Sequence, residues 1–124
     1  MRFMVLIYAN PKNWEHPMFL HEGTDLPEVE RSAMLAQFER MMSDTDASGE
    51  LQTAFALANP SEAKLLSARN GELLATDGPF AEAKEFLAGT FIFECESLDR
   101  AVEIAGRFPD VRFGTVEVRP IMEL

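Results

Sequence analysis

The unbroken apolar stretch from Phe3 to Ala9 limits the fold of this chain more than any other feature. A half-buried strand alternates apolar and polar residues, whereas this stretch does not, so it predicts a strand covered on both faces. A layer of helices can cover one face, and something else must cover the other. The stretch is far shorter than the roughly 20 apolar residues that span a bilayer. Asn10-Pro11-Lys12 follows it in place of a small-residue cleavage pattern, so a signal peptide is not expected.

Helix-like and strand-like patterns alternate along the rest of the chain. A first helix of roughly 17 residues is predicted to begin after an N-cap at Asp25, and a second is capped by Ser97. Their apolar stripes are Met34, Leu35, Phe38, Met41 and Met42 in the first, and Leu98, Ala101, Val102, Ala105 and Phe108 in the second. Strands are predicted at 51–57, 89–96 and 113–121, and Asn70-Gly71 predicts a tight hairpin between strands at 64–69 and 72–76.

The order of these elements predicts an α+β fold. Without the hairpin, the order is strand-helix-strand followed by strand-helix-strand. Such a split βαβ repeat gives a four-stranded antiparallel sheet with both helices on one face, the ferredoxin-like arrangement, here with an inserted β-hairpin. The helices leave the other face bare, and its apolar content needs a cover. The sheet of a second subunit is the simplest cover, so a homodimer is expected.

Composition excludes several classes of protein. The 124 residues suit a single domain, and 21 acidic against 11 basic residues give a net charge of −10. No segment concentrates Lys or Arg, so nucleic-acid binding is not expected. No segment is long and apolar enough to cross a membrane, which makes a cytoplasmic location the default expectation. The single cysteine, Cys95, alternates with phenylalanines and is expected to be a small buried residue instead of a nucleophile.

Several ordered motifs resemble the YCII-related, DGPF-domain proteins. They are Met4-Val5-Leu6-Ile7-Tyr8, Asp77-Gly78-Pro79-Phe80-Ala81-Glu82 with Lys84-Glu85, Gly89, Leu98-Asp99-Arg100-Ala101 and Phe113-Gly114-Thr115-Val116-Glu117-Val118-Arg119-Pro120. The resemblance covers nearly the whole chain and implies one domain over residues 1–124, a dimeric α+β barrel and a bacterial, cytoplasmic protein. Members are often encoded beside extracytoplasmic-function sigma factors, and a cleft with an acidic residue has been suggested for relatives. Ala83 departs from the pattern, which usually has threonine there.

Asp77 is the candidate catalytic residue. A carboxylate next to Phe80 can be partly desolvated, which raises its pKa and suits general acid–base chemistry. The alternative is structural, because Asp-Gly sequences favour turns and Asp caps them. Both interpretations stay open at this point.

Four further residues are candidates for binding a substrate: Tyr8, Glu82, Lys84 and Arg119. Lys84 can hold a carboxylate, and Arg119 becomes an anion-binding group if its face of the last strand is covered by a second subunit. Tyr8 ends the first strand and can donate a hydrogen bond. Each also has an ordinary alternative, as a solvated charge, a surface ion pair or an amphipathic strand end.

No metal or cofactor is expected. His16 and His21 share no helical or strand face, and no phosphate-binding or dinucleotide motif occurs. Three functions remain: an enzyme acting on a small organic molecule with Asp77 as acid or base, a non-catalytic binding or regulatory module, and a structural dimerisation unit. A cleft with perturbed carboxylates favours the first, an apolar pocket the second and a filled interior the third.

Overall fold

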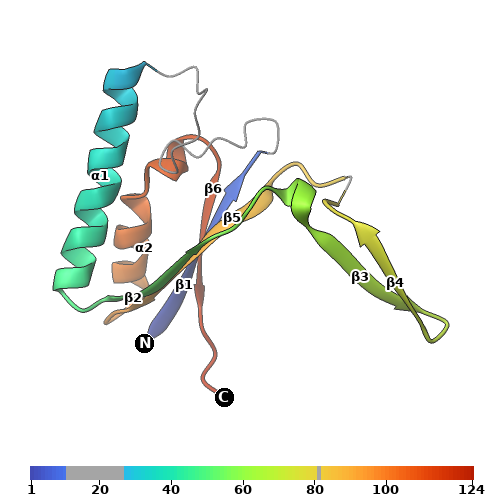
Figure 1. Ribbon diagram of the computed structural model, residues 1–124. Helices are drawn as coiled ribbons and strands as arrows, with labels where there is room; N and C mark the ends of the chain where they lie inside the picture. Colours follow the sequence, from blue (N-terminus) through green and yellow to red (C-terminus); the bar gives the residue numbers. More distant parts are fainter. Residues whose placement is uncertain (11–26, 81) are drawn as a thin grey trace.

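The structure is a computed structural model that describes residues 1–10, 27–80 and 82–124 (Figure 1). Its strands are β1 (Arg2–Ala9), β2 (Leu51–Ala56), β3 (Lys64–Arg69), β4 (Glu72–Asp77), β5 (Phe86–Glu94) and β6 (Thr115–Pro120). Its helices are α1 (Glu28–Ala47) and α2 (Leu98–Gly106), with short 3-10 helices η2 (Pro60–Glu62) and η3 (Pro109–Arg112).

The body of the molecule is a four-stranded sheet in the order β2-β5-β1-β6, and its neighbouring strands are antiparallel. Figure 1 shows α1 and α2 side by side on one face of this sheet. The antiparallel sheet with helices on one side confirms the expected α+β class.

β1 has the two-sided apolar character that its sequence predicts. Phe3, Val5 and Ile7 are fully buried on the face covered by the helices, while Met4 and Leu6 are partly exposed on the other face. We call this second face the helix-free face. By strand register it comprises Arg2, Met4, Leu6, Tyr8, Thr53, Phe55, Leu87, Thr90, Ile92, Glu94, Thr115, Glu117 and Arg119. None of the described helices or strands forms a second layer on this face, so its apolar residues call for a further cover.

An aromatic cluster fills the space between the sheet and the helices. The rings of Phe91 and Phe108 meet edge to face with centroids 4.8 Å apart, and Phe38 of α1 lies 6.0 Å from each. Such edge-to-face pairs add about 0.5–1.5 kcal/mol each beyond the area they bury. The cluster therefore fixes both helices on one face of the sheet.

Both helices form, with differences from the predicted details. α1 has 20 residues and begins after Pro27, which makes no side-chain cap, while the predicted N-cap Asp25 lies outside the described residues. Ser97 does cap α2, its hydroxyl accepting a hydrogen bond from the Arg100 amide. The predicted stripe of α2 is wrong at Leu98 and Val102, which are exposed, because Ile104 joins Ala101 and Ala105 against the sheet instead.

The inserted hairpin is confirmed. β3 and β4 pair from Lys64 with Asp77 to Arg69 with Glu72, and Asn70 and Gly71 both have positive φ, as a tight hairpin turn requires. We call residues 64–77 the arm. The two strands form a sheet of their own, and Figure 1 shows the arm projecting away from the body.

Candidate functional site

The Asp-Gly-Pro-Phe motif closes the base of the arm. Asp77 ends β4 and accepts a hydrogen bond from Lys64 across the hairpin. The Gly78 amide donates to the Ala63 carbonyl at 2.8 Å, and a Cβ on Gly78 would lie only 2.9 Å from the Cβ of Ala63. A larger residue at Gly78 would push the two ends of the hairpin apart. The close approach of the two segments therefore explains a glycine at this position.

A cavity of about 500 Å³ lies where the arm joins the body. This volume is within the usual range of small-molecule sites, roughly 300–1,000 Å³. Its apolar lining includes Leu57, Pro60, Leu65, Phe80, Phe86 and Leu87. Glu62 and Glu85 also line the cavity, together with Asn59. The cavity thus combines apolar walls with a few polar groups, and it disfavours the purely structural function, which required a filled interior.

The loop between β4 and β5 carries two of the predicted binding residues, and neither of them lines the cavity. Ala83 and Glu85 line the cavity, whereas Glu82 and Lys84 are exposed and are not among its lining residues. Ala83 stands where the resembling family has threonine, so this departure makes the wall more apolar at a point where a hydroxyl is usual.

A second group of polar side chains lies on the helix-free face. The Tyr8 hydroxyl donates to Glu117 Oε1 at 2.9 Å, and the Arg119 Nε donates to Glu117 Oε2 at 2.9 Å. Tyr8 pairs with Thr115 in the register, which makes Glu117 its diagonal neighbour on the same face. Two of the predicted binding residues, Tyr8 and Arg119, are therefore brought together, and Glu117 joins them.

The hydrogen bonds of this group fix its protonation states. Arg119 and then Tyr8 lower the pKa of the Glu117 carboxyl, so it stays charged near neutral pH. The bond to Glu117, reinforced by burial, raises the pKa of the Tyr8 hydroxyl, which therefore stays protonated. The carboxylate likewise raises the pKa of the Arg119 guanidinium. The group thus offers a fixed cation and a phenol.

The polar group and the cavity are neighbours through Leu87. This residue lines the cavity and is the register partner of Tyr8 between β1 and β5. The segment before β6 approaches the end of β1, since a Cβ on Gly114 would lie 2.3 Å from the Tyr8 carbonyl oxygen. The end of β1 therefore links the start of β5, which lines the cavity, to the start of β6, but Tyr8, Glu117 and Arg119 are not among the lining residues themselves.

Asp77 is placed differently from the sequence-based expectation. Its side chain is 79% exposed in the single chain and is paired with Lys64, so the partial desolvation expected next to Phe80 is not found there. Asp77 is the last residue of β4 and lies two residues before Pro79, which lines the cavity. Asp77 itself is not among the lining residues. The bond to Lys64 across the hairpin is an interaction that neither sequence-based interpretation of Asp77 included.

Glu117 and the cavity walls were not predicted as site residues. Glu117 lies two residues before Arg119 on the same face of β6. Knowledge of the register between β1 and β6 would therefore have revealed Glu117 as a neighbour of Tyr8. The walls come from the end of β2, the arm and β5, and no local pattern signals such a meeting of distant segments.

The two histidines weighed as metal ligands belong to one loop of the sequence. His16 and His21 lie outside the described residues, and so do most residues of the loop that carries them. Within residues 1–10, 27–80 and 82–124, no group of three or more His, Cys, Asp or Glu side chains could hold a metal ion. Across the same residues, no helix has both the length and the apolar character needed to cross a membrane.

Similarity to known proteins agrees with this fold. An uncharacterized protein of Rhizobium meliloti is 36% identical over 92 residues, which are 67% of this chain and 74% of that protein. The solved structure of 5-chloro-2-hydroxyhydroquinone dehydrochlorinase from Burkholderia phenoliruptrix, in complex with 2,5-dihydroxybenzoquinone, is similar with a TM-score of 0.50. It is 15% identical, and the likeness covers 98% of this chain and 94% of that one. The YCII-related domain family matches residues 1–124, so the chain belongs to the YCII-related family.

Proposed function

We propose that this protein is an enzyme that acts on a small organic molecule bound in the cavity at the base of the arm. The observation that carries the proposal is the cavity itself, about 500 Å³ with mostly apolar walls, one of which, Leu87, is the register partner of Tyr8. A largely apolar pocket with a few convergent polar groups is the usual form of a small-molecule site. A structural neighbour with the same kind of fold holds a quinone, which makes a cyclic, oxygenated ligand a sensible class to test first.

The polar groups suggest separate roles. Arg119 supplies a permanent cation for an anionic oxygen of the ligand, and Tyr8 supplies a phenolic donor. Asp77 is the proposed acid or base, which can act once a ligand or a second copy covers its exposed carboxylate. Glu82 and Lys84 stay predictions from the family resemblance, as groups on the outer side of the same loop.

The proposed assembly is a homodimeric α+β barrel. The strand order β2-β5-β1-β6, with both helices on one face, supports a ferredoxin-like split βαβ repeat. In the barrel, the helix-free faces of two copies stack and cover each other's apolar residues. The proposed setting, a bacterial cytoplasm, rests on the family resemblance.

Binding is tested with 2,5-dihydroxybenzoquinone and a panel of hydroquinones. We expect at least one compound to raise the melting temperature of the protein, and Phe80→Ala, which removes a cavity wall, to abolish that rise. Val29→Ala is the matched control, because Val29 is 81% exposed on α1 and remote from the cavity lining. A shift that survives Phe80→Ala would place the ligand elsewhere.

A binding or regulatory module without catalysis is the second candidate, including one associated with an extracytoplasmic-function sigma factor. The observation that favours it is that Asp77 does not line the cavity. Absorbance and NMR of the incubated compounds separate the two functions, since an enzyme consumes its ligand and loses turnover in Asp77→Asn. Binding with no change in any compound would support the module.

A further inference from the structure

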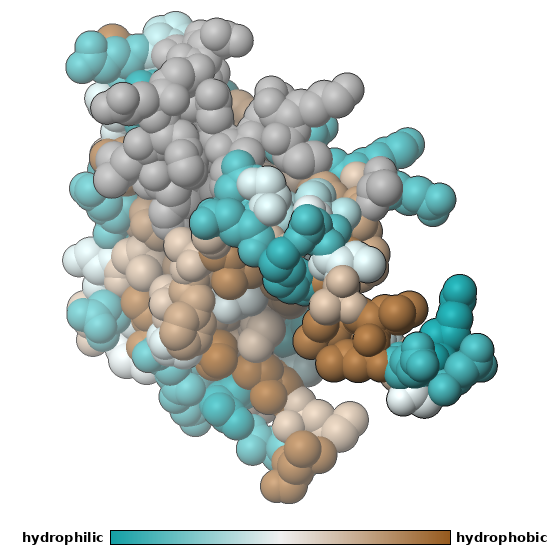
Figure 2. All heavy atoms as spheres, turned by 45° about the vertical axis from the view of Figure 1, so that its right-hand side comes forward, coloured by the Kyte–Doolittle hydropathy of each residue, from teal (hydrophilic) through white to brown (hydrophobic). Residues whose placement is uncertain are grey.

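The arm presents an apolar surface that is largely exposed among the residues the structure describes. Leu66 pairs with Ala75, and Ala68 pairs with Leu73, so these four side chains share one face of the hairpin, on which Lys64 and Asp77 form a charged pair at the base. Leu66 is 65% and Leu73 is 72% exposed. We call these four residues the outer face of the arm, because the cavity residue Leu65 belongs to the opposite face. Figure 2 shows the apolar side chains gathered on the arm, next to a hydrophilic tip.

A hairpin of this kind needs support from outside. β3 and β4 pair only with each other among the described strands, and an isolated two-stranded hairpin is at best marginally stable in water. Polar residues on its solvent side would be the normal pattern for a free hairpin. The opposite is found here, with leucines and alanines on the outer face, so this face is suited to contact with another surface.

The exposed area of the chain is larger than that of an average folded monomer. The chain exposes 8294 Å², whereas a folded monomer of its mass is expected to expose about 6,700 Å². The exposed leucines of the projecting arm are part of this surface, and a second copy could cover them.

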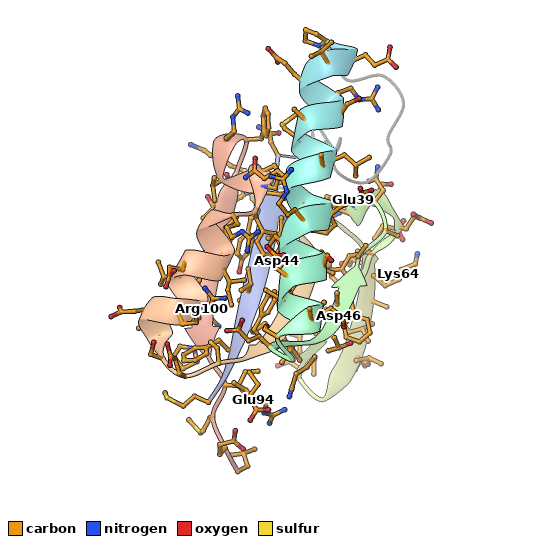
Figure 3. The ribbon with its side chains drawn as sticks, turned by 90° about the vertical axis from the view of Figure 1, so that its left-hand side faces the viewer. Glu39, Asp44, Asp46, Lys64, Glu94 and Arg100 are labelled. Carbon is orange, nitrogen blue, oxygen red and sulfur yellow. The ribbon has the colours of Figure 1, made fainter. Side chains whose placement is uncertain are left out.

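The distribution of charge points to the same occupant. The chain carries a net charge of −10, so two copies repel each other over most of their surface. The arm is neutral, because Lys64 and Arg69 balance Glu72 and Asp77. The helix-free face is neutral too, with two acidic and two basic residues, whereas Figure 3 shows Glu39, Asp44 and Asp46 on α1 in the helix layer. Two copies can therefore approach through the arm and the helix-free face with the least repulsion.

We propose that the outer face of the arm is a docking surface for a second copy of this chain. Each arm reaches past its own helix-free face and packs its outer leucines against the partner, which adds to the contact between stacked sheets. In a two-fold symmetric dimer both arms do so reciprocally. The inference rests on the proposed homodimer and names a part of the interface that sheet stacking alone does not include.

The test measures the dimer dissociation constant of two variants by sedimentation. Leu66→Glu with Leu73→Glu puts two charges on the outer face, and we expect the constant to rise about tenfold or more. The matched control, Ser67→Glu with Thr76→Glu, puts the same two charges on the opposite face of the same strands. We expect the control to dimerise like the unmodified chain.

Several results would overturn the proposal: equal weakening in both variants, no weakening in the outer-face variant, or a monomeric unmodified chain at about 100 μM.

Hydrogen exchange of the unmodified chain tests the proposal without variants that could misfold. We expect arm amides to lose protection on dilution while β1 and β5 amides keep it, and concentration-independent protection of the arm would count against docking. Ligand binding tests the proposed enzyme separately, so failure of one proposal is distinguishable from failure of the other.

Discussion

At the scale of single residues, Gly114 sets how closely the segment before β6 approaches β1. A Cβ there would lie 2.3 Å from the Tyr8 carbonyl oxygen, and this backbone atom cannot swing aside. We expect Gly114→Ala to lower the free energy of unfolding by about 1–3 kcal/mol, the usual cost of overpacking, as measured in urea. Gly106→Ala is the control, since no atom lies within 4 Å of its added Cβ. If both variants are equally stable, the close approach at Gly114 does not constrain the fold.

Arg119 sets the charge state of the polar group on the helix-free face. Its hydrogen bond is the largest cause of the lowered pKa of Glu117, and the bond from Tyr8 is the next. We therefore expect Arg119→Met to raise the pKa of Glu117 more than Tyr8→Phe does, in a titration followed by NMR of the carboxyl carbon. A larger rise in Tyr8→Phe would show that the bond from the phenol, and not the bond from the guanidinium, contributes most to the lowered pKa of Glu117.

At the scale of elements, an ion pair joins the turn before β2 to the first turn of α2. Arg100 donates to both carboxylate oxygens of Glu50 at 2.9 Å, and Ser48 donates to one of them at 2.7 Å. These bonds lower the pKa of Glu50 to about 2 from its ordinary value of 4.5. The Glu50 side chain is 16% exposed, so solvent screens the pair less than it would an open surface pair.

The lowered pKa of Glu50 predicts a specific pH dependence. Its stabilisation is fully present above pH 4.5 and is lost as the pH falls toward about 2, because over this range the unfolded state binds a proton at this carboxyl and the folded state does not. We expect Glu50→Gln to be less stable than the unmodified chain at pH 7, by at most about 3 kcal/mol. Urea unfolding at pH 7 and pH 3 should show the difference shrinking at pH 3. A constant or growing difference would exclude this carboxylate as the source.

The elements also show what the sequence can and cannot predict. The hairpin followed from Asn70-Gly71, and the burial of alternate residues in β5 followed from period-two patterning, because both signals are local. The buried side of α2 was missed at Ile104, because contact with the sheet, and not apolarity alone, decides which residues are covered. The cavity could not be predicted, since its walls come from segments that meet only in the folded chain.

At the scale of the whole molecule, charge and apolar surface are kept apart. The net charge of −10 does not lie on the two surfaces proposed to meet a second copy, the arm and the helix-free face, which are both neutral. Apolar contact can then drive association while the acidic remainder opposes it. The balance between these two contributions should depend on salt, which screens the repulsion and leaves apolar contact intact.

We therefore expect added salt to tighten the dimer. Raising the ionic strength from about 10 mM to about 150 mM shortens the screening length from roughly 30 Å to 8 Å, so long-range repulsion between the two acidic chains falls. Sedimentation at several protein concentrations should show the dissociation constant falling several-fold over this range. Glu39→Lys should act in the same direction at low salt, because it replaces an exposed acid on α1 by a base without touching either neutral surface. A dimer that weakens as salt is added would mean instead that ion pairs across the interface hold it together, and the neutral arm would then not be the main contact.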